Sequence, residues 1–183
     1  MNDQHSAVGS APNASRRSRV ERGMSGDAVI MGAYRYTLWR EWTQDLPRLL
    51  FVLLNPSRAD AELDDPTLRR CMGFALDWGY GSVELVNLYA YRAPDPRTLK
   101  RVADPVGPLN DHHIQQAAGR AGKIVVAWGV LGELHGRDQT VQRLLTQPLW
   151  CLGYTRGEAP RHPLYVRRDA PLLPYPAITI SQA

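Results

Sequence analysis

Apolar runs bounded by turn-forming residues divide most of the chain into strands and helices. Apolar and aromatic residues alternate with others over residues 29–42, a pattern typical of an antiparallel hairpin or of edge strands. Later runs are continuously apolar, as in strands that are covered on both faces. These predicted strands span residues 49–54, 83–89, 123–129 and 149–153.

Helical spacing of apolar side chains fills the intervals between these strands. Residues 68–76 show it after Asp65-Pro66, a typical helix start, and before Gly79. Further helices are expected over residues 110–121, with Asn110 in the N-cap region, and over residues 137–145. The alternation predicts an α/β fold: a three-layer α/β/α arrangement around a mostly parallel sheet of about four strands.

The two ends of the chain have a different composition. Residues 1–24 are rich in Ser, Asn, Gly, Ala and Arg and show no hydrophobic period, which predicts a disordered leader. Residues 25–183 are expected to form a single domain, because a chain of 183 residues fits one domain. The proline-rich segment after Arg168 is expected to run over its surface.

Composition narrows the class of protein further. Hydrophobic residues make up 44% of the chain, enough for a buried core, but no apolar run approaches the roughly 18–20 residues that cross a bilayer. Cys71 and Cys151 are far apart and fit no metal-binding spacing, so we expect reduced thiols in a cytoplasmic, monomeric protein. The net charge of +4 favours a polyanionic partner, although arginines of the leader contribute part of it.

Ligands of such sheets bind outside the carboxyl ends of the strands, which places several polar residues along one rim. Asn55-Pro56-Ser57 ends the first of these strands, as a turn or as an amide that positions a water molecule or a substrate carbonyl. Asn87 lies inside an apolar strand, where an unmatched amide costs about 1–3 kcal/mol. It either bonds a neighbouring loop or presents a donor and an acceptor to the edge of a base.

Three acidic or basic features of the rim have two interpretations each. His162 is either a surface residue or a donor to an oxyanion that develops on a base. Asp64 and Asp65 either cap a helix or serve as a general base or metal ligand. Arginines near the rim are either solvated or hold DNA phosphates, and the candidates are Arg58, Arg70, Arg92 and Arg161.

Short motifs follow one another in a characteristic order over about residues 34–166. They are Leu54-Asn55-Pro56-Ser57, Asp65-Pro66-Thr67, Arg70-Cys71, Trp78-Gly79-Tyr80-Gly81, Val86-Asn87-Leu88, Tyr91-Arg92, Asp95-Pro96, Pro105-Val106-Gly107-Pro108, Asn110-Asp111, Ala127-Trp128-Gly129 and His162-Pro163-Leu164-Tyr165. Together they resemble a bacterial and phage family described only as a domain of unknown function (number 1643). That resemblance implies no activity.

A second resemblance, to the uracil-DNA glycosylase superfamily, is more informative. Leu54-Asn55-Pro56 looks like the Asn-Pro motif after the superfamily's first core strand, and Val86-Asn87 looks like its base-reading strand. Trp128-Gly129 and His162-Pro163 are similar to its later strand end and closing loop. Leu53 stands where the superfamily has glycine, and Leu164 where it has serine.

The resemblance implies a uracil-DNA glycosylase-like fold and hydrolysis of the N-glycosidic bond of a modified or mismatched base in DNA, without metal or organic cofactor. Asn55, Asp64, Asp65 and His162 would be catalytic, and Pro56, Ser57, Asn87 and Trp128 would bind the base. Two alternatives remain: a non-catalytic module that binds a base or nucleotide, and a hydrolase or transferase that acts on a small nucleotide.

Overall fold

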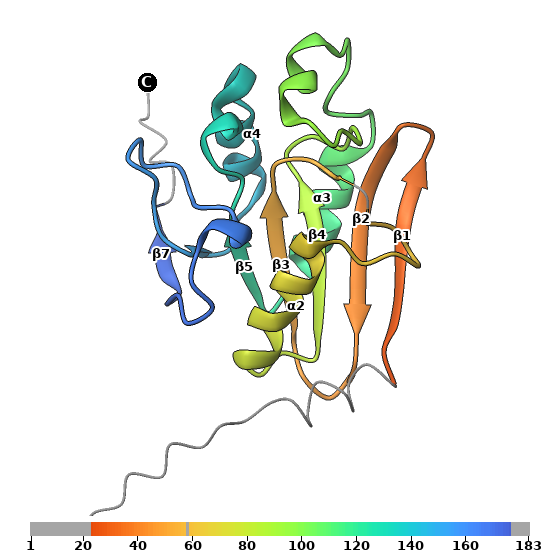
Figure 1. Ribbon diagram of the computed structural model, residues 1–183, viewed down its shortest axis with the longest axis vertical. Helices are drawn as coiled ribbons and strands as arrows, with labels where there is room; N and C mark the ends of the chain where they lie inside the picture. The colour runs from red at the N-terminus through yellow and green to blue at the C-terminus, as the bar shows by residue number, and fades with distance from the viewer. Residues whose placement is uncertain (1–22, 58, 177–183) are drawn as a thin grey trace, which may run out of the picture.

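The computed structural model describes residues 23–57 and 59–176, and these form one seven-stranded mixed sheet in the order β1-β2-β4-β3-β5-β6-β7 (Figure 1). The strands are β1 (Ser25–Met31), β2 (Tyr34–Glu41), β3 (Arg48–Leu53), β4 (Ser82–Asn87), β5 (Lys123–Val126), β6 (Leu149–Cys151) and β7 (Leu173–Tyr175). The α-helices are α2 (Pro66–Asp77), α3 (Asn110–Gly119) and α4 (Arg137–Leu144). Short 3-10 helices are η1 (Pro96–Arg101), η2 (Val130–Gly136) and η3 (Pro163–Tyr165).

The α/β class and the four predicted parallel strands are confirmed, but the sheet is larger than expected. Strands β4, β3, β5 and β6 run parallel, and the predicted hairpin β1–β2 adds to β4 in antiparallel orientation. On the other side, β7 pairs antiparallel with β6. Strand β7 was not predicted from the sequence because it contains Pro174, and proline is rare inside strands. Proline is tolerated here because β7 is an edge strand, where its missing N–H needs no partner.

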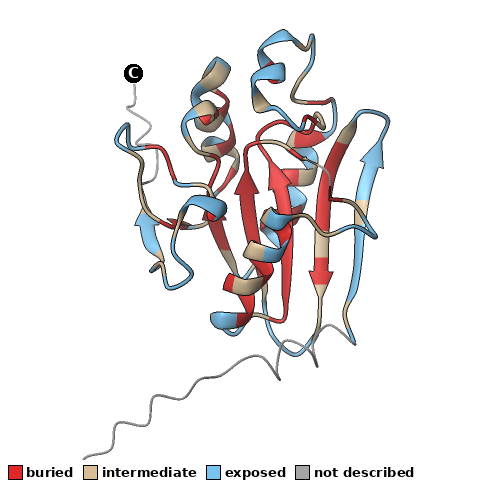
Figure 2. Cartoon of the chain, viewed as in Figure 1, coloured by how far each residue is buried: buried red, intermediate tan, exposed pale blue. Residues whose placement is uncertain are grey.

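Two groups of buried side chains lie on opposite faces of the sheet. Alternate positions of β3, such as Phe51, pack with Leu68 and Phe74 of α2, which crosses the front of the sheet in Figure 1. The intervening positions, such as Val52, pack with Ile114 of α3 behind it. Figure 2 shows the central strands buried along their length, as the continuous apolar runs predict.

Asn110 does not cap α3, contrary to the sequence prediction. The N-cap residue is Leu109, which makes no side-chain capping bond. Asn110 is instead fully buried, and its Nδ2 donates to the carbonyl oxygens of Asn87 and Leu88, both at 3.0 Å. The amide satisfies backbone acceptors where β4 ends, so it fixes the start of α3 against the end of that strand.

Most of the predicted leader lies outside the described residues, since the structure begins at Gly23 and β1 begins at Ser25. Cys71 and Cys151 are buried free thiols, as predicted. Within residues 23–57 and 59–176, no helix is long and apolar enough to span a membrane.

Candidate functional site

A cavity of about 600 Å³ opens at the carboxyl ends of the central strands, on the face covered by α2. Leu53 and Leu85 of the sheet contribute to its apolar lining, and Trp128 contributes from the end of β5. Six of the residues singled out from the sequence line it: Asn55, Ser57, Asp65, Trp128, Arg161 and His162. Segments distant in the sequence therefore meet at one site.

Asn55 holds together the two loops that follow β3 and β4. Its Nδ2 donates to the carbonyl oxygens of Pro56 at 3.0 Å and Ala93 at 2.8 Å. The backbone N–H of Ala93 also donates to the Pro56 carbonyl, at 3.0 Å. Both hydrogens of the Asn55 side-chain amide are thus bonded to backbone carbonyls. Its Oδ1 can therefore accept a hydrogen bond from a ligand or a water molecule.

Asp65 and Asp64 have separate roles. Asp65 is the N-cap of α2, as one interpretation of the sequence predicts, and its Oδ1 accepts from the backbone N–H of Leu68 at 2.8 Å. Asp65 also lines the cavity, whereas Asp64 is not among its lining residues. Asp64 instead forms an ion pair with the buried Arg40, with its Oδ1 2.7 Å from Nη2. Of the two carboxylates, Asp65 is therefore the one that lines the cavity.

His162 faces the cavity as a neutral imidazole. Burial lowers its pKa to about 4, and the nearby Asp65 carboxylate offsets only part of that effect. The Nδ1 atom accepts from the backbone N–H of Leu164 at 3.4 Å, at the start of η3. An accepting Nδ1 carries no proton, so the proton of the neutral ring lies on Nε2. His162 is therefore a hydrogen-bond donor through Nε2 near neutral pH.

The wall formed by Trp128 depends on two glycines. Gly129 has a φ of +71°, a conformation that side-chain-bearing residues rarely adopt, and its N–H donates to the Pro160 carbonyl at 2.9 Å. A Cβ atom on Gly132 would lie 2.1 Å from Cδ1 of Trp128, so the indole packs directly on this residue. The lack of a side chain at Gly132 thus allows the Trp128 ring to pack against η2.

Asn87 does not line the cavity. It pairs with Leu53 in the sheet and shares a face with Leu85, and both of these leucines do line it. Asn87 is 0% exposed, and neither its Nδ2 nor its Oδ1 has a hydrogen-bond partner within residues 23–57 and 59–176. The side chain is therefore buried near the cavity, with both polar groups unmatched.

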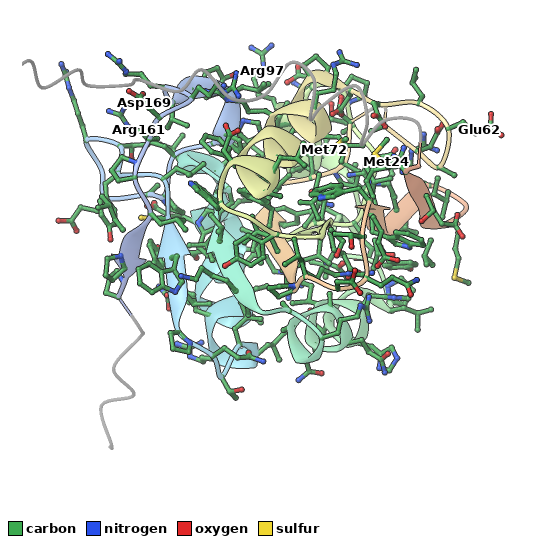
Figure 3. The ribbon with its side chains drawn as sticks, turned by 90° about the horizontal axis from the view of Figure 1, so that it is seen from below. Met24, Glu62, Met72, Arg97, Arg161 and Asp169 are labelled. Atoms are coloured by element: carbon green, nitrogen blue, oxygen red, sulfur yellow. The ribbon has the colours of Figure 1, made fainter. Side chains whose placement is uncertain are left out.

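The arginines predicted to hold DNA phosphates have diverse environments. Arg70 donates from Nε to the Pro163 carbonyl at 3.3 Å and from Nη2 to the Val166 carbonyl, and it is not a lining residue. It connects α2 to the loop that carries His162. Arg92 is half-buried outside the lining, and Arg58 is outside the described residues. Arg161 is exposed, lines the cavity and lies at the outside of the molecule in Figure 3.

Sequence reasoning missed Arg35, a cavity residue of β2 that is 2% exposed. A charged residue between Tyr34 and Tyr36 in a strand was the available signal. Pro56, proposed as a base-binding residue, is buried and contributes its carbonyl to the loop contacts, but it does not line the cavity. In the described part of the chain, no group of three His, Cys, Asp or Glu side chains is placed to hold a metal ion.

A family model described as a protein of unknown function, DUF1643, matches residues 35–164. The matched span runs from β2 to η3 and includes Arg35, Asn55, Asp65 and His162. No curated protein and no solved structure matches the chain.

Proposed function

The chain belongs to the DUF1643 family, and we propose that it is a DNA glycosylase-like hydrolase that cleaves the N-glycosidic bond of a modified or mismatched base. The observation that carries the proposal is the position of a neutral histidine, an amide oxygen and a carboxylate on one cavity. His162, Asn55 and Asp65 come from three different loops, yet all three line it. The motifs that contain Asn55 and His162 are also among those that resemble the uracil-DNA glycosylase superfamily.

The three groups match the charges that develop as a glycosidic bond breaks. As the bond between C1′ and the base nitrogen lengthens, negative charge moves onto the base and positive charge onto the sugar. The Nε2–H of His162 would donate to the base oxygen that gains charge, and its low pKa keeps it a donor rather than an acid at neutral pH. The Asp65 carboxylate would stabilise the positive sugar.

Water completes the reaction at C1′. The free Oδ1 of Asn55 would orient a water molecule by accepting one of its hydrogens. The water oxygen forms a bond to C1′ as the bond from C1′ to the base breaks. The water proton that is not bonded to Asn55 passes to the Asp65 carboxylate. Asp65 then gives this proton to the departing base, which leaves as a neutral molecule. We assign no part in this step to Asp64, because its carboxylate is paired with Arg40.

The size and lining of the cavity suit a base that has left the helical stack. A volume of about 600 Å³ lies within the range of small-ligand sites, and the indole of Trp128 offers an apolar wall. The exposed Arg156 and Arg161 also line it, where they would meet the DNA backbone. We assign no base contact to Asn87 in this conformation, because its side chain does not line the cavity.

An abasic-site assay tests the proposal. Single- and double-stranded oligonucleotides that carry uracil, hypoxanthine or a hypermodified base are incubated with the protein, and abasic product is measured. We expect product from at least one substrate and its loss in Asn55→Ala, with Gln139→Ala on the exposed face of α4 as a control that keeps activity. Because Asn55 connects two loops, the fold of the variant is checked by thermal melting. Tight binding without any product would instead support a base-binding module.

A further inference from the structure

A β-bulge turns Arg35 toward the cavity. Val29 pairs with Thr37 and Ile30 with Arg35, so Tyr36 is an extra residue in β2. The Tyr36 ring stacks on the His113 ring of α3, with 4.8 Å between the ring centroids, on the face of the sheet opposite the cavity. Arg35 lies on the opposite face, where it contacts Ala59 and lines the cavity. Bulges commonly redirect a side chain in this way beside a functional site.

One edge of the Arg35 guanidinium has no partner among the described residues. Nη1 donates to the Ala59 carbonyl at 2.7 Å. Nε is buried without a hydrogen bond, and Nη2 donates to no acceptor among the described residues. Nε and Nη2 form the edge that binds two oxygens side by side. The protein uses this edge on carboxylates elsewhere, as in Arg167 with Asp169 at 3.0 and 3.1 Å and Arg168 with Asp77 at 3.1 and 3.2 Å.

Other buried arginines of the described chain are paired, which distinguishes Arg35 from them. Arg40 is bound to Asp64, and Arg137 is bound to Asp111. Arg35 forms no ion pair with a described residue, although Asp65 is near enough to raise its pKa. Burial lowers the pKa of Arg35 to about 10, so the guanidinium remains charged at neutral pH. An unpaired charge of this kind is costly in a protein interior and calls for a bound anion.

We propose that Arg35 is the anion-binding subsite of the cavity, and that the ligand carries a phosphate or a carboxylate that contacts Nε and Nη2. This proposal rests on the proposed function, because it places the ligand in the same cavity. It goes further by stating that the ligand is negatively charged. The anion is either the phosphate of the nucleotide or an acidic group on a modified base.

Calorimetric titration with matched ligands tests the subsite. The probes are 2′-deoxyuridine, its 5′-monophosphate, and 5-carboxy-2′-deoxyuridine, which carries the anion on the base. We expect one anionic probe to bind about 10- to 100-fold more tightly than the neutral nucleoside, the range for a charge-assisted contact. The probe that gains affinity identifies the source of the anion. Equal affinity of all three, or no binding of any, would overturn the proposal.

Variants then assign the preference to Arg35. Arg35→Gln should abolish it, Arg35→Lys should keep part of it, and Arg143→Gln on α4 should leave it unchanged. Should the Arg35 variants fail to fold, competition by inorganic phosphate against the anionic probe on the wild-type protein decides the matter: competition supports the subsite, and its absence overturns it. If abasic product forms but no anionic probe is preferred, only the anion-binding subsite is contradicted. If an anionic probe is preferred but no abasic product forms, only the proposed glycosylase activity is contradicted.

Discussion

Acidification should destabilise the wild-type protein more than a variant in which asparagine replaces His162. Burial lowers the pKa of His162 from 6.5 to about 4, so the unfolded chain binds a proton over a pH range in which the folded protein does not. The stabilisation is fully present above pH 6.5 and is lost as the pH falls toward 4. Linkage with these two pKa values gives a loss of about 2 kcal/mol at pH 5 and about 3 kcal/mol at pH 4.

Asparagine is the suitable replacement because it does not titrate and its side-chain oxygen can still accept from the N–H of Leu164. The assay is guanidinium unfolding, followed by tryptophan fluorescence at pH 7.5 and pH 5 for both proteins. The difference between their free energies of unfolding removes the contribution of every other titrating group. A loss of about 2 kcal/mol corresponds to a fall in melting temperature of about 4–8 °C beyond that of the variant.

The control is His135→Asn, which removes an exposed imidazole of η2 and should leave the wild-type pH dependence in place. Parallel stability curves for wild type and His162→Asn between pH 7.5 and 5 would refute the reasoning. The imidazole would then take up a proton as readily in the folded protein as in the unfolded chain, and it could not act as a permanently neutral donor.

Three further changes test the site's construction through the free energy of unfolding. Asp65→Ala should lower the free energy of unfolding by about 1 kcal/mol, because the N-cap of α2 is removed. Asp65→Asn should lower it much less, since asparagine also caps helices. Equal losses in the two variants would contradict the capping role. Gly132→Ala should lose about 1–3 kcal/mol, since the new Cβ must displace Trp128, and an unchanged stability would contradict that packing. Asn87→Leu should gain about 1 kcal/mol by removing an unmatched buried amide, and a loss would indicate a partner for it.

The parallel centre of the sheet could be predicted from the sequence because its strands are continuous apolar runs separated by helical spacing. The cap at Asp65-Pro66 was equally visible, since both residue types favour a helix start. Strand β7 was not, because its three residues, Leu173–Tyr175, contain a proline and follow no apolar pattern. Its pairing with β6 depends on tertiary contact rather than on local preference.

The candidate site was predictable where a recognisable motif ends a strand or begins a short helix. Asn55 and Trp128 follow strands β3 and β5, His162 precedes η3, and all three line the cavity. Arg35 lies inside a strand, and its direction depends on a bulge at Tyr36 that no alternation of residues reveals. Asn87 was predicted to face the site because it is a polar residue near a strand end. Its side chain is instead buried and does not line the cavity.

The most direct test of the central claim compares cleavage with binding in His162→Ala. On a substrate that the wild-type protein cleaves, single-turnover rates and oligonucleotide affinity are measured for both proteins. The proposed role requires the Nε2–H mainly as charge develops on the base, so the cleavage rate should fall about 10²- to 10³-fold while affinity changes little. An unchanged cleavage rate, or a loss of affinity that accounts for the whole decrease, would contradict the claim.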